Sequence, residues 1–219
     1  MNATDGATMR HIIQIEPILM QSFVFFIFLT VTLQVQGQTW SEDSTNQHIL
    51  ISTSTVAGKY QINAKMIVNA TPLAFFNLLE NTPIDCSWIA NCKSVTVLDQ
   101  SLPDYRFVHT VFNSPWPVAD REMYTRSHHV FSADMQHLSI MIEDISAQYP
   151  THPKNVMMKA VQAQWSMTHS HDDWYELNYL ASADPGGNIP QWLSQRLLKD
   201  STFTTLKQLR AILHAQHSQ

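Results

Sequence analysis

Histidines and acidic residues gather in one short polar stretch, where they could bind a metal ion. His169, His171, Asp172 and Asp173 occur within five residues, and histidine and carboxylate side chains are common zinc ligands. The same residue types are also typical of a polar turn that joins two strands of a hairpin. We favour the hairpin turn, so the sequence predicts neither a metal site nor a cofactor.

Two groups of neighbouring charges have the residue types of acid–base pairs. Glu143 and Asp144 are adjacent, so on a strand their side chains point to opposite faces and cannot act together on one substrate. Asp120, Arg121 and Glu122 stand at the predicted start of a strand, where we expect charge pairing that holds a loop in place. The sequence also lacks a glycine-rich phosphate loop, a zinc cysteine pair and a nucleophile elbow. No catalytic residue is therefore predicted.

The elements that would position these residues are mostly strands. Eight runs have the residue types and spacing of strands: 49–56, 60–68, 94–98, 105–112, 122–131, 138–145, 157–168 and 174–183. Turn residues separate the later runs, which indicates antiparallel pairing of consecutive strands. A short helix is predicted after the second run, with Thr71 as its cap, Pro72 in its first turn and its end near Asn81. Residues 38–47 are polar and without periodicity, so we expect a leader there.

The C-terminal segment is predicted to be a long amphipathic helix that follows a glycine turn. Gly186 and Gly187 permit a sharp reversal of the chain, and Pro190 suits the first turn of a helix. Apolar residues recur after it at helical spacing: Ile189, Trp192, Leu193, Leu197, Leu206, Leu209, Ile212 and Leu213. A helix with one apolar stripe must bury it, and the partner here is a sheet. The predicted fold class is therefore α+β, a curved antiparallel sheet wrapped around a long C-terminal helix.

The inner faces of the last two strands are apolar. Tyr175, Leu177, Tyr179 and Ala181 share one face of one strand, and Val161, Ala163, Trp165 and Met167 share one face of the other. Ten methionines add adaptable side chains. Both a solid core and a ligand cavity fit this pattern.

Composition narrows the range of partners. Hydrophobic residues make up 44% of the chain and charged residues 14%, which is a globular composition. The formal net charge is −5, and no basic stripe occurs, so no nucleic-acid partner is expected.

The N-terminus predicts export. The apolar run 23–33 follows Arg10 and ends before Val35-Gln36-Gly37, which is typical of a signal peptide cleaved near Gly37. We expect residues 1–37 to be the signal peptide and 38–219 one domain, periplasmic or secreted. An uncleaved membrane anchor is the alternative, and translation could begin at Met1 or Met9. Cys86 and Cys92 could form a disulfide after export, or remain two separate thiols.

Several stretches occur in the order typical of a known family. They are Trp88–Cys92, Ser114–Glu122, a strand centred on Trp165, and Asp184–Leu193, followed by Leu206–Arg210. Together they resemble the START (StAR-related lipid-transfer) domain, in the bacterial form that carries a signal peptide. The resemblance covers roughly Trp40 to Leu213. The chain lacks the long first helix of animal members.

The resemblance implies the helix-grip fold, with a hydrophobic tunnel between sheet and helix that holds one sterol, phospholipid, sphingolipid or similar apolar molecule. It implies a carrier rather than an enzyme, a transient contact with a membrane surface, and a monomer. Ser114–Asp120 would border the tunnel mouth, and the helix from Pro190 would be a moving lid. A polyketide cyclase or aromatase of the same superfamily is the alternative, and it would need acid–base groups inside the cavity.

The residues expected in the tunnel or lid are His109, Trp116, Val118, Arg126, Trp165, Tyr175, Tyr179, Ile189, Trp192 and Leu193. Trp192 is expected to line the tunnel or its mouth. His109 and Arg126 offer polar anchors, although a satisfied strand histidine and a surface ion pair are the alternative interpretations. The acidic–basic pair that some family members place inside the tunnel cannot be identified from the sequence.

Overall fold

The structure is a computed structural model that describes residues 41–217 except 47–48, 57, 100–101 and 115–116. All of these belong to one compact unit, Gly37–Gln219. The predicted signal peptide lies outside the described residues. Within them, no helix is both long enough and apolar enough to cross a membrane.

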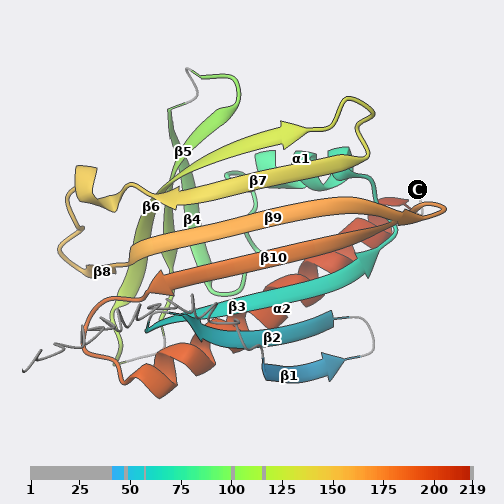
Figure 1. The fold of residues 1–219 in the computed structure, drawn as a ribbon. Coiled ribbons are helices and arrows are strands. Elements are labelled where there is room, and N and C mark those ends of the chain that lie inside the picture. The colour runs from blue at the N-terminus through green and yellow to red at the C-terminus, as the bar shows by residue number, and fades with distance from the viewer. Residues whose placement is uncertain (1–40, 47–48, 57, 100–101, 115–116, 218–219) are drawn as a thin grey trace, which may run out of the picture. The chain divides into compact units, whose positions relative to one another are not determined.

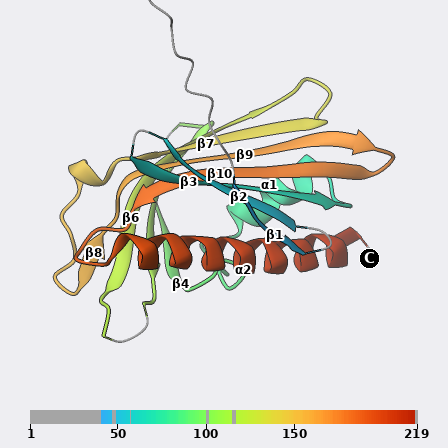
Figure 2. The same ribbon diagram turned by 60° about the horizontal axis from the view of Figure 1, so that its bottom comes forward.

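A sheet and one long helix form the framework of this unit (Figure 1). The elements in chain order are β1 (Ser41–Asn46), β2 (Ile49–Val56), β3 (Lys59–Val68), α1 (Pro72–Glu80), β4 (Cys92–Asp99), β5 (Tyr105–Phe112), β6 (Asp120–Phe131), β7 (His137–Asp144), a 3-10 turn (Ser146–Gln148), β8 (Asn155–Met157), β9 (Lys159–His171), β10 (Trp174–Asp184) and α2 (Gln191–His217). The strand order is β1-β2-β3-β10-β9-β7-β6-β5-β4, and these neighbours are antiparallel. α2 lies along one face of the sheet and packs mainly against β2 and β3 (Figure 2). The predicted α+β helix-grip architecture is confirmed.

The first helix forms where the sequence predicted it. The Thr71 hydroxyl accepts a hydrogen bond from the Ala74 N–H at 3.2 Å, and Pro72 occupies the first turn, where its missing N–H is not needed. The helix is capped at its other end by Asn81. Phe75 is fully buried and packs α1 against the sheet, because its ring centroid lies 5.4 Å from that of Trp165 on β9.

Two strand predictions were wrong in detail. The polar residues expected to form a leader include β1, which pairs with β2 through its backbone. Backbone pairing at a sheet edge needs no apolar periodicity, so the sequence pattern gave no signal. The run predicted as one strand over 157–168 is divided into β8 and β9, and β8 pairs in parallel with β6. Ala160, just inside β9, has φ of 50°, a left-handed conformation that turns the chain between the two pairings.

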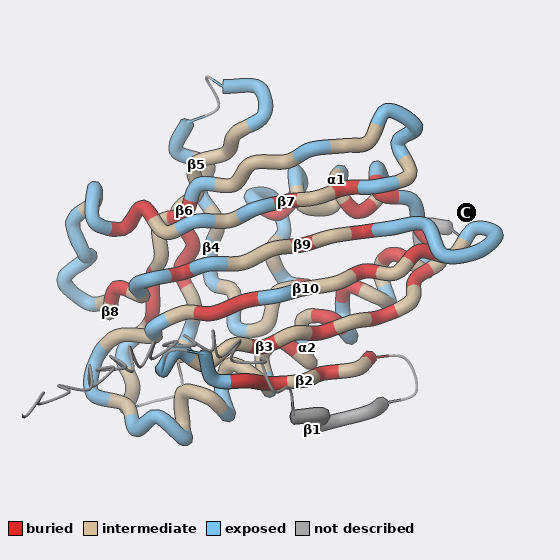
Figure 3. Tube along the Cα trace, viewed as in Figure 1, coloured by how far each residue is buried: buried red, intermediate tan, exposed pale blue. Residues whose placement is uncertain are grey.

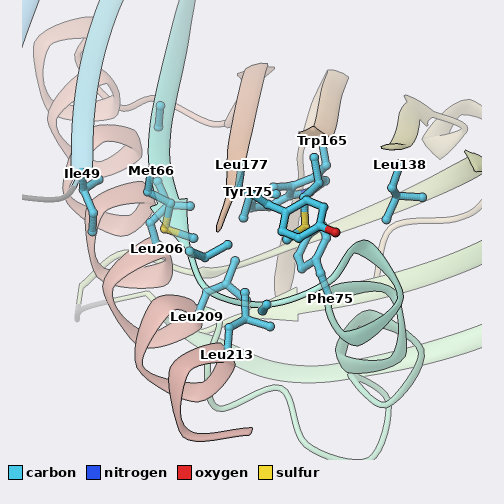
Figure 4. Packing of buried hydrophobic residues seen from close by; sticks show 14 of the residues in the cluster. Ile49, Met66, Phe75, Leu138, Trp165, Tyr175, Leu177, Leu206, Leu209 and Leu213 are labelled. Carbon is cyan, nitrogen blue, oxygen red and sulfur yellow. The ribbon is translucent and has the colours of Figure 1, made fainter. Parts of the chain in front are cut away.

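The packed core lies under α1 and the second half of α2. Leu206, Leu209 and Leu213 of α2 are at most 1% exposed and contact the inner face of β2, β3 and β10 (Figure 4). Buried positions concentrate along β2, β3 and β10, whereas β4 is half-buried or exposed throughout and β5 is mostly half-buried (Figure 3). The core therefore occupies only part of the inner face of the sheet.

The apolar residues of α2 do not form one continuous stripe. At about 100° per residue, Leu197 lies about 180° around the helix from Leu206. Leu197 is 38% exposed and Trp192 is 65% exposed, whereas Leu206 is buried. In the first half of α2, Leu197 thus points away from the core, whereas Leu198 packs against it. Gln195 stands one heptad before the buried Thr202 and shares its side of the helix.

Candidate ligand site

The inner face of β5 and β6 can be traced from the core by strand register. Trp165 of the core pairs with Ile140 on β7, and Ile140 pairs with His129 on β6. Side chains that pair directly across strands point to the same face. His129 and every second residue before it on β6 therefore face inward: Ser127, Thr125, Met123 and Arg121. Their partners on β5 include Val108, Thr110 and Phe112.

Apolar side chains on this part of the inner face are not fully buried. Val95 and Val97 of β4, Val108 and Phe112 of β5, and Met123 of β6 are all half-buried. They lie beyond the strands against which α2 packs. This arrangement leaves partly exposed apolar surface on the inner face, which is the kind of surface that favours an apolar ligand.

Hydroxyl groups and one guanidinium complete the same face. Thr110 and Thr125 are each 4% exposed, and Ser127 is half-buried. Arg121, at the start of β6, is 8% exposed. No role was predicted for these hydroxyls, because isolated threonines on a strand carry no motif. The two-residue alternation nevertheless places them beside Met123 and Val108.

The charges at the start of β6 are arranged differently from the predicted cluster. Asp120 accepts hydrogen bonds from Lys93 Nζ at 2.8 Å and from the Ser114 N–H at 3.0 Å, so it holds the preceding loop as expected. Arg121 and Glu122 do not pair with each other, because consecutive strand residues point to opposite faces. Arg121 instead donates to the Ala119 carbonyl and to Ser114 Oγ.

His109 lies on the outer face of β5 and does not reach the inner one. It pairs with Tyr124, whose neighbour Thr125 faces inward. His109 Nε2 is 3.1 Å from Glu122 Oε2, and its ring stacks on Tyr124 with centroids 4.2 Å apart. The satisfied strand histidine is thus the correct interpretation, and a role as tunnel anchor does not fit this position.

Arg126 also points outward. Its Nη2 lies 2.5 Å from Glu143 Oε2 on β7, and both side chains are exposed. The hydrogen bond and charge of Glu143 raise the pKa of Arg126 further above its ordinary value. This is the surface ion pair that the sequence allowed as the alternative, and it removes Arg126 from the inner face.

The aromatic candidates Trp165, Tyr175 and Tyr179 do face inward, but the first two belong to the packed core. Each of these two is 6% exposed. The Tyr175 hydroxyl donates to Gln136, and the Trp165 ring lies 4.1 Å from that of Tyr179. Burial raises the pKa of Tyr179 to about 12. In this arrangement Trp165 and Tyr175 contact protein side chains.

The lid candidates lie around the start of α2 and the loop before β6. Trp116 lies outside the described residues. Val118, Ile189 and Leu193 are half-buried. Trp192 is 65% exposed, so the expectation that it lines the interior does not fit its position. Trp192 lies only about 40° around the helix from Leu206, so helical phase does not explain its exposure. It stands in the first turn of α2, and the buried positions of this helix begin at Thr202.

A disulfide closes the loop that leads into β4. Cys86 and Cys92 are bonded, with Cα atoms 6.0 Å apart. Within this loop Trp88 is buried, and the Ala90 N–H donates to Thr205 Oγ1 of α2 at 3.0 Å. The loop is therefore attached to the helix as well as closed on itself.

The histidine-rich hairpin is a surface turn. His169 Nε2 lies 2.7 Å from the Asp172 carbonyl oxygen, and Asp172 has φ of 47°, as a tight turn requires. A shallow hollow beside it is lined by both this turn and the β6–β7 turn. In the part of the chain that the structure describes, no three His, Cys, Asp or Glu residues are placed to hold a metal ion.

Comparison with known proteins identifies the family. A model of the START domain matches residues 30–219. A StAR-related lipid transfer protein of Xanthomonas axonopodis superposes with a TM-score of 0.71 at 21% identity, over 80% of this chain and 98% of that one. Human StAR-related lipid transfer protein 5 gives a TM-score of 0.72 at 12% identity, over 81% of this chain and 88% of that one.

A relative of closer sequence is an uncharacterized protein of Pseudomonas aeruginosa. It is 26% identical over 137 residues, which are 61% of this chain and 65% of that protein. The alignment therefore spans somewhat less than two thirds of the relative, and the structural matches, all of low identity, bear on the fold. The family model covers far more than half of the chain, and on that ground the protein belongs to the START domain family.

Proposed function

We propose that the protein binds one hydrophobic, lipid-like molecule and carries or presents it without changing it chemically. The observation that supports this most directly is the half-buried apolar face of β4, β5 and β6, which lies beyond the strands against which α2 mainly packs. Moving a lipid chain from water onto such a surface contributes about 25 cal/mol per Å² of apolar surface buried. The structural neighbours are named as lipid transfer proteins, which agrees with this proposal.

The distribution of polar groups favours binding over catalysis. Acid–base catalysis needs several such groups within hydrogen-bonding reach of one substrate. On the inner face of β6, Arg121 and His129 are eight residues apart, or roughly 26 Å at the rise of a strand. His129 is also stacked on Phe76, with centroids 4.4 Å apart, under α1. A cyclase-like mechanism would need these groups close together, so we place it second.

The proposed place of action is the cell envelope. The predicted signal peptide supports export, and the Cys86–Cys92 disulfide is of the kind that persists in oxidising compartments. The outward face of α2 supports a transient contact with membranes, because it exposes Trp192 and Leu197 beside Arg196. We propose that the protein works as a monomer at this surface.

Native mass spectrometry of the purified protein tests the binding proposal. We expect a mass increment of one lipid per chain, which organic extraction removes. Protein that never carries an increment, and that takes up no lipid when mixed with vesicles, would contradict it. N-terminal sequencing of the envelope fraction tests export, with a first residue close to position 38 as the expected result. A chain that begins at Met1 in the cytosol would exclude it.

A further inference from the structure

Arg121 carries a buried charge on the inner face of the sheet. It is 8% exposed, and its register partners on the two neighbouring strands are Phe112 of β5 and Val156 of β8. Its position alternates with that of Glu122, which belongs to the outer face. The guanidinium is thus directed toward the space between β6 and the start of α2.

Within the described part of the chain, no acidic side chain lies within ion-pair distance of this guanidinium. Its Nη1 donates to the Ala119 carbonyl and to Ser114 Oγ at 3.5 Å, and both partners are uncharged. Asp120 is engaged by Lys93 and the Ser114 N–H. Among the described residues, every ion pair within 4.0 Å joins other side chains.

The buried charge of Arg121 would be stabilised by a bound anion. Burial lowers the pKa of Arg121, and only the charge of Asp120 opposes that effect. A charge removed from water is costly unless a counter-charge or a full set of hydrogen bonds replaces the solvent. A guanidinium has five N–H donors in a planar fork, and only Nη1 is engaged here, so Nη2 and Nε remain for a bidentate acceptor.

The surroundings of Arg121 fit a polar head group with a chain beyond it. Gly187, at the turn into α2, lies over the guanidinium, and a Cβ built there would be 3.7 Å from Nη2. Hydroxyls of Thr110 and Thr125 share the face of Arg121, and the inner positions of the first half of α2 include Gln195. Farther along the same face come the half-buried apolar residues Val95, Val97, Val108 and Met123.

We infer that Arg121 binds the anionic head group, a carboxylate or a phosphate, of an amphipathic lipid whose chain lies along the inner face of β4, β5 and β6. This inference rests on the proposed lipid-binding function and adds the class of ligand and its orientation. The polar end lies at the start of α2, and the hydrocarbon points away from it.

Head-group discrimination tests the inference. Delipidated protein is titrated with oleate, with oleyl alcohol of the same chain, and with oleoyl lysophosphatidate, each below its aggregation concentration. We expect wild-type protein to bind at least one anion about tenfold more tightly than the alcohol, because one charge-assisted bidentate contact is lost with the neutral head. The relative affinities of oleate and lysophosphatidate then decide between carboxylate and phosphate.

Variants assign the preference to Arg121. Arg121→Met should lose about tenfold in anion affinity and keep alcohol affinity within about twofold. Arg121→Lys should retain part of the preference, and Arg126→Met, which removes an exposed outward arginine, should bind as wild type.

Two outcomes overturn the inference and leave the proposed function intact. The first is wild-type protein that binds oleate, lysophosphatidate and oleyl alcohol equally, which decides the question even if Arg121→Met does not fold. A folded Arg121→Met variant with unchanged preference also overturns it. Failure of wild-type protein to bind any of the three contradicts the proposed function itself.

Discussion

His109 of β5 and Glu122 of β6 meet on the outer face of the sheet, with His109 Nε2 3.1 Å from Glu122 Oε2. Glu122 is fully buried, and it also accepts from Asn155 Nδ2 at 2.9 Å and from the His152 N–H at 2.6 Å. The carboxylate thus holds the segment before β8 against the sheet. The pair has a structural role on the face opposite the proposed ligand site.

This network predicts a loss of stability in acid. Burial acts to raise the pKa of Glu122, but hydrogen bonds from Asn155, His152 and His109 outweigh it and hold the pKa below its ordinary value of 4.5. A carboxylate with a lowered folded pKa contributes stability above its unfolded pKa and loses it as pH falls through the folded pKa. We expect Glu122→Gln to lower the free energy of unfolding at pH 7 by about 2 kcal/mol. The gap from wild type should narrow below about pH 4, as measured by urea titrations.

An exposed carboxylate provides the control. Glu143 is 56% exposed and pairs with Arg126 on the same outer face. Glu143→Gln should cost less than about 1 kcal/mol. If both variants lost the same unfolding free energy at every pH, the buried position of Glu122 would make no extra contribution to stability.

The disulfide should contribute measurable stability. Cys86→Ser with Cys92→Ser removes a crosslink that closes a short loop, so we expect a loss of roughly 2 kcal/mol in unfolding free energy. Wild-type protein treated with reductant should fall to the same value. A reductant that destabilises the double-serine variant equally would mean that the effect does not come from this bond.

The fold could be predicted from the sequence because its signals are local. Thr71-Pro72 marks a helix start by hydrogen-bonding chemistry that needs no distant partner, and the alternation in β9 and β10 fixes which residues share a face. β1 had no such signal, since backbone pairing of the kind that joins it to β2 needs no apolar periodicity in the sequence.

The site was predicted less well because it depends on which face of each strand turns inward. His109 and Arg126 have the residue types of polar anchors, but each stands at a position of its strand whose side chain points outward. This can be recognised only from the pairing of β5 and β6 with the strands of the core. Arg121 was assigned to a charge cluster for the same reason, because adjacency in sequence suggests pairing and strand geometry separates the neighbours.

The first turn of α2 is exposed and its second half is buried along one side, which predicts opposite outcomes for two large residues of this helix. Trp192→Ala should change the free energy of unfolding by less than about 0.5 kcal/mol, since the side chain is 65% exposed. Leu209→Ala should lose about 2–5 kcal/mol, since Leu209 is fully buried in the core. Chemical denaturation measures both values.

A membrane assay extends that comparison. If the outward face of α2 touches membranes, Trp192→Ala should also slow lipid transfer between vesicles, whereas Met141→Ala, an exposed apolar residue on β7, should not. A stability loss for Trp192→Ala as large as that for Leu209→Ala would contradict the exposed position of Trp192 in the first turn of α2.

The three glycines with positive φ predict a graded series that tests how the start of α2 is seated. Gly58, Gly186 and Gly187 have φ of 77°, 67° and 67°, so alanine at any of them carries the strain of a left-handed conformation, about 1–2 kcal/mol. At Gly58 an added Cβ meets nothing within 4 Å, and at Gly187 it meets Val156 Cγ1 at 3.5 Å, an ordinary contact. At Gly186 it would overlap the Met157 carbonyl oxygen and lie 3.0 Å from Val156 Cγ1. We therefore expect Gly58→Ala and Gly187→Ala to lose similar amounts, and Gly186→Ala to lose roughly 2–5 kcal/mol in total, because the turn must move away from β8. Thermal and urea unfolding of the three variants measure these losses of stability. Equal losses for Gly58→Ala and Gly186→Ala would show that the turn before α2 does not pack closely against β8.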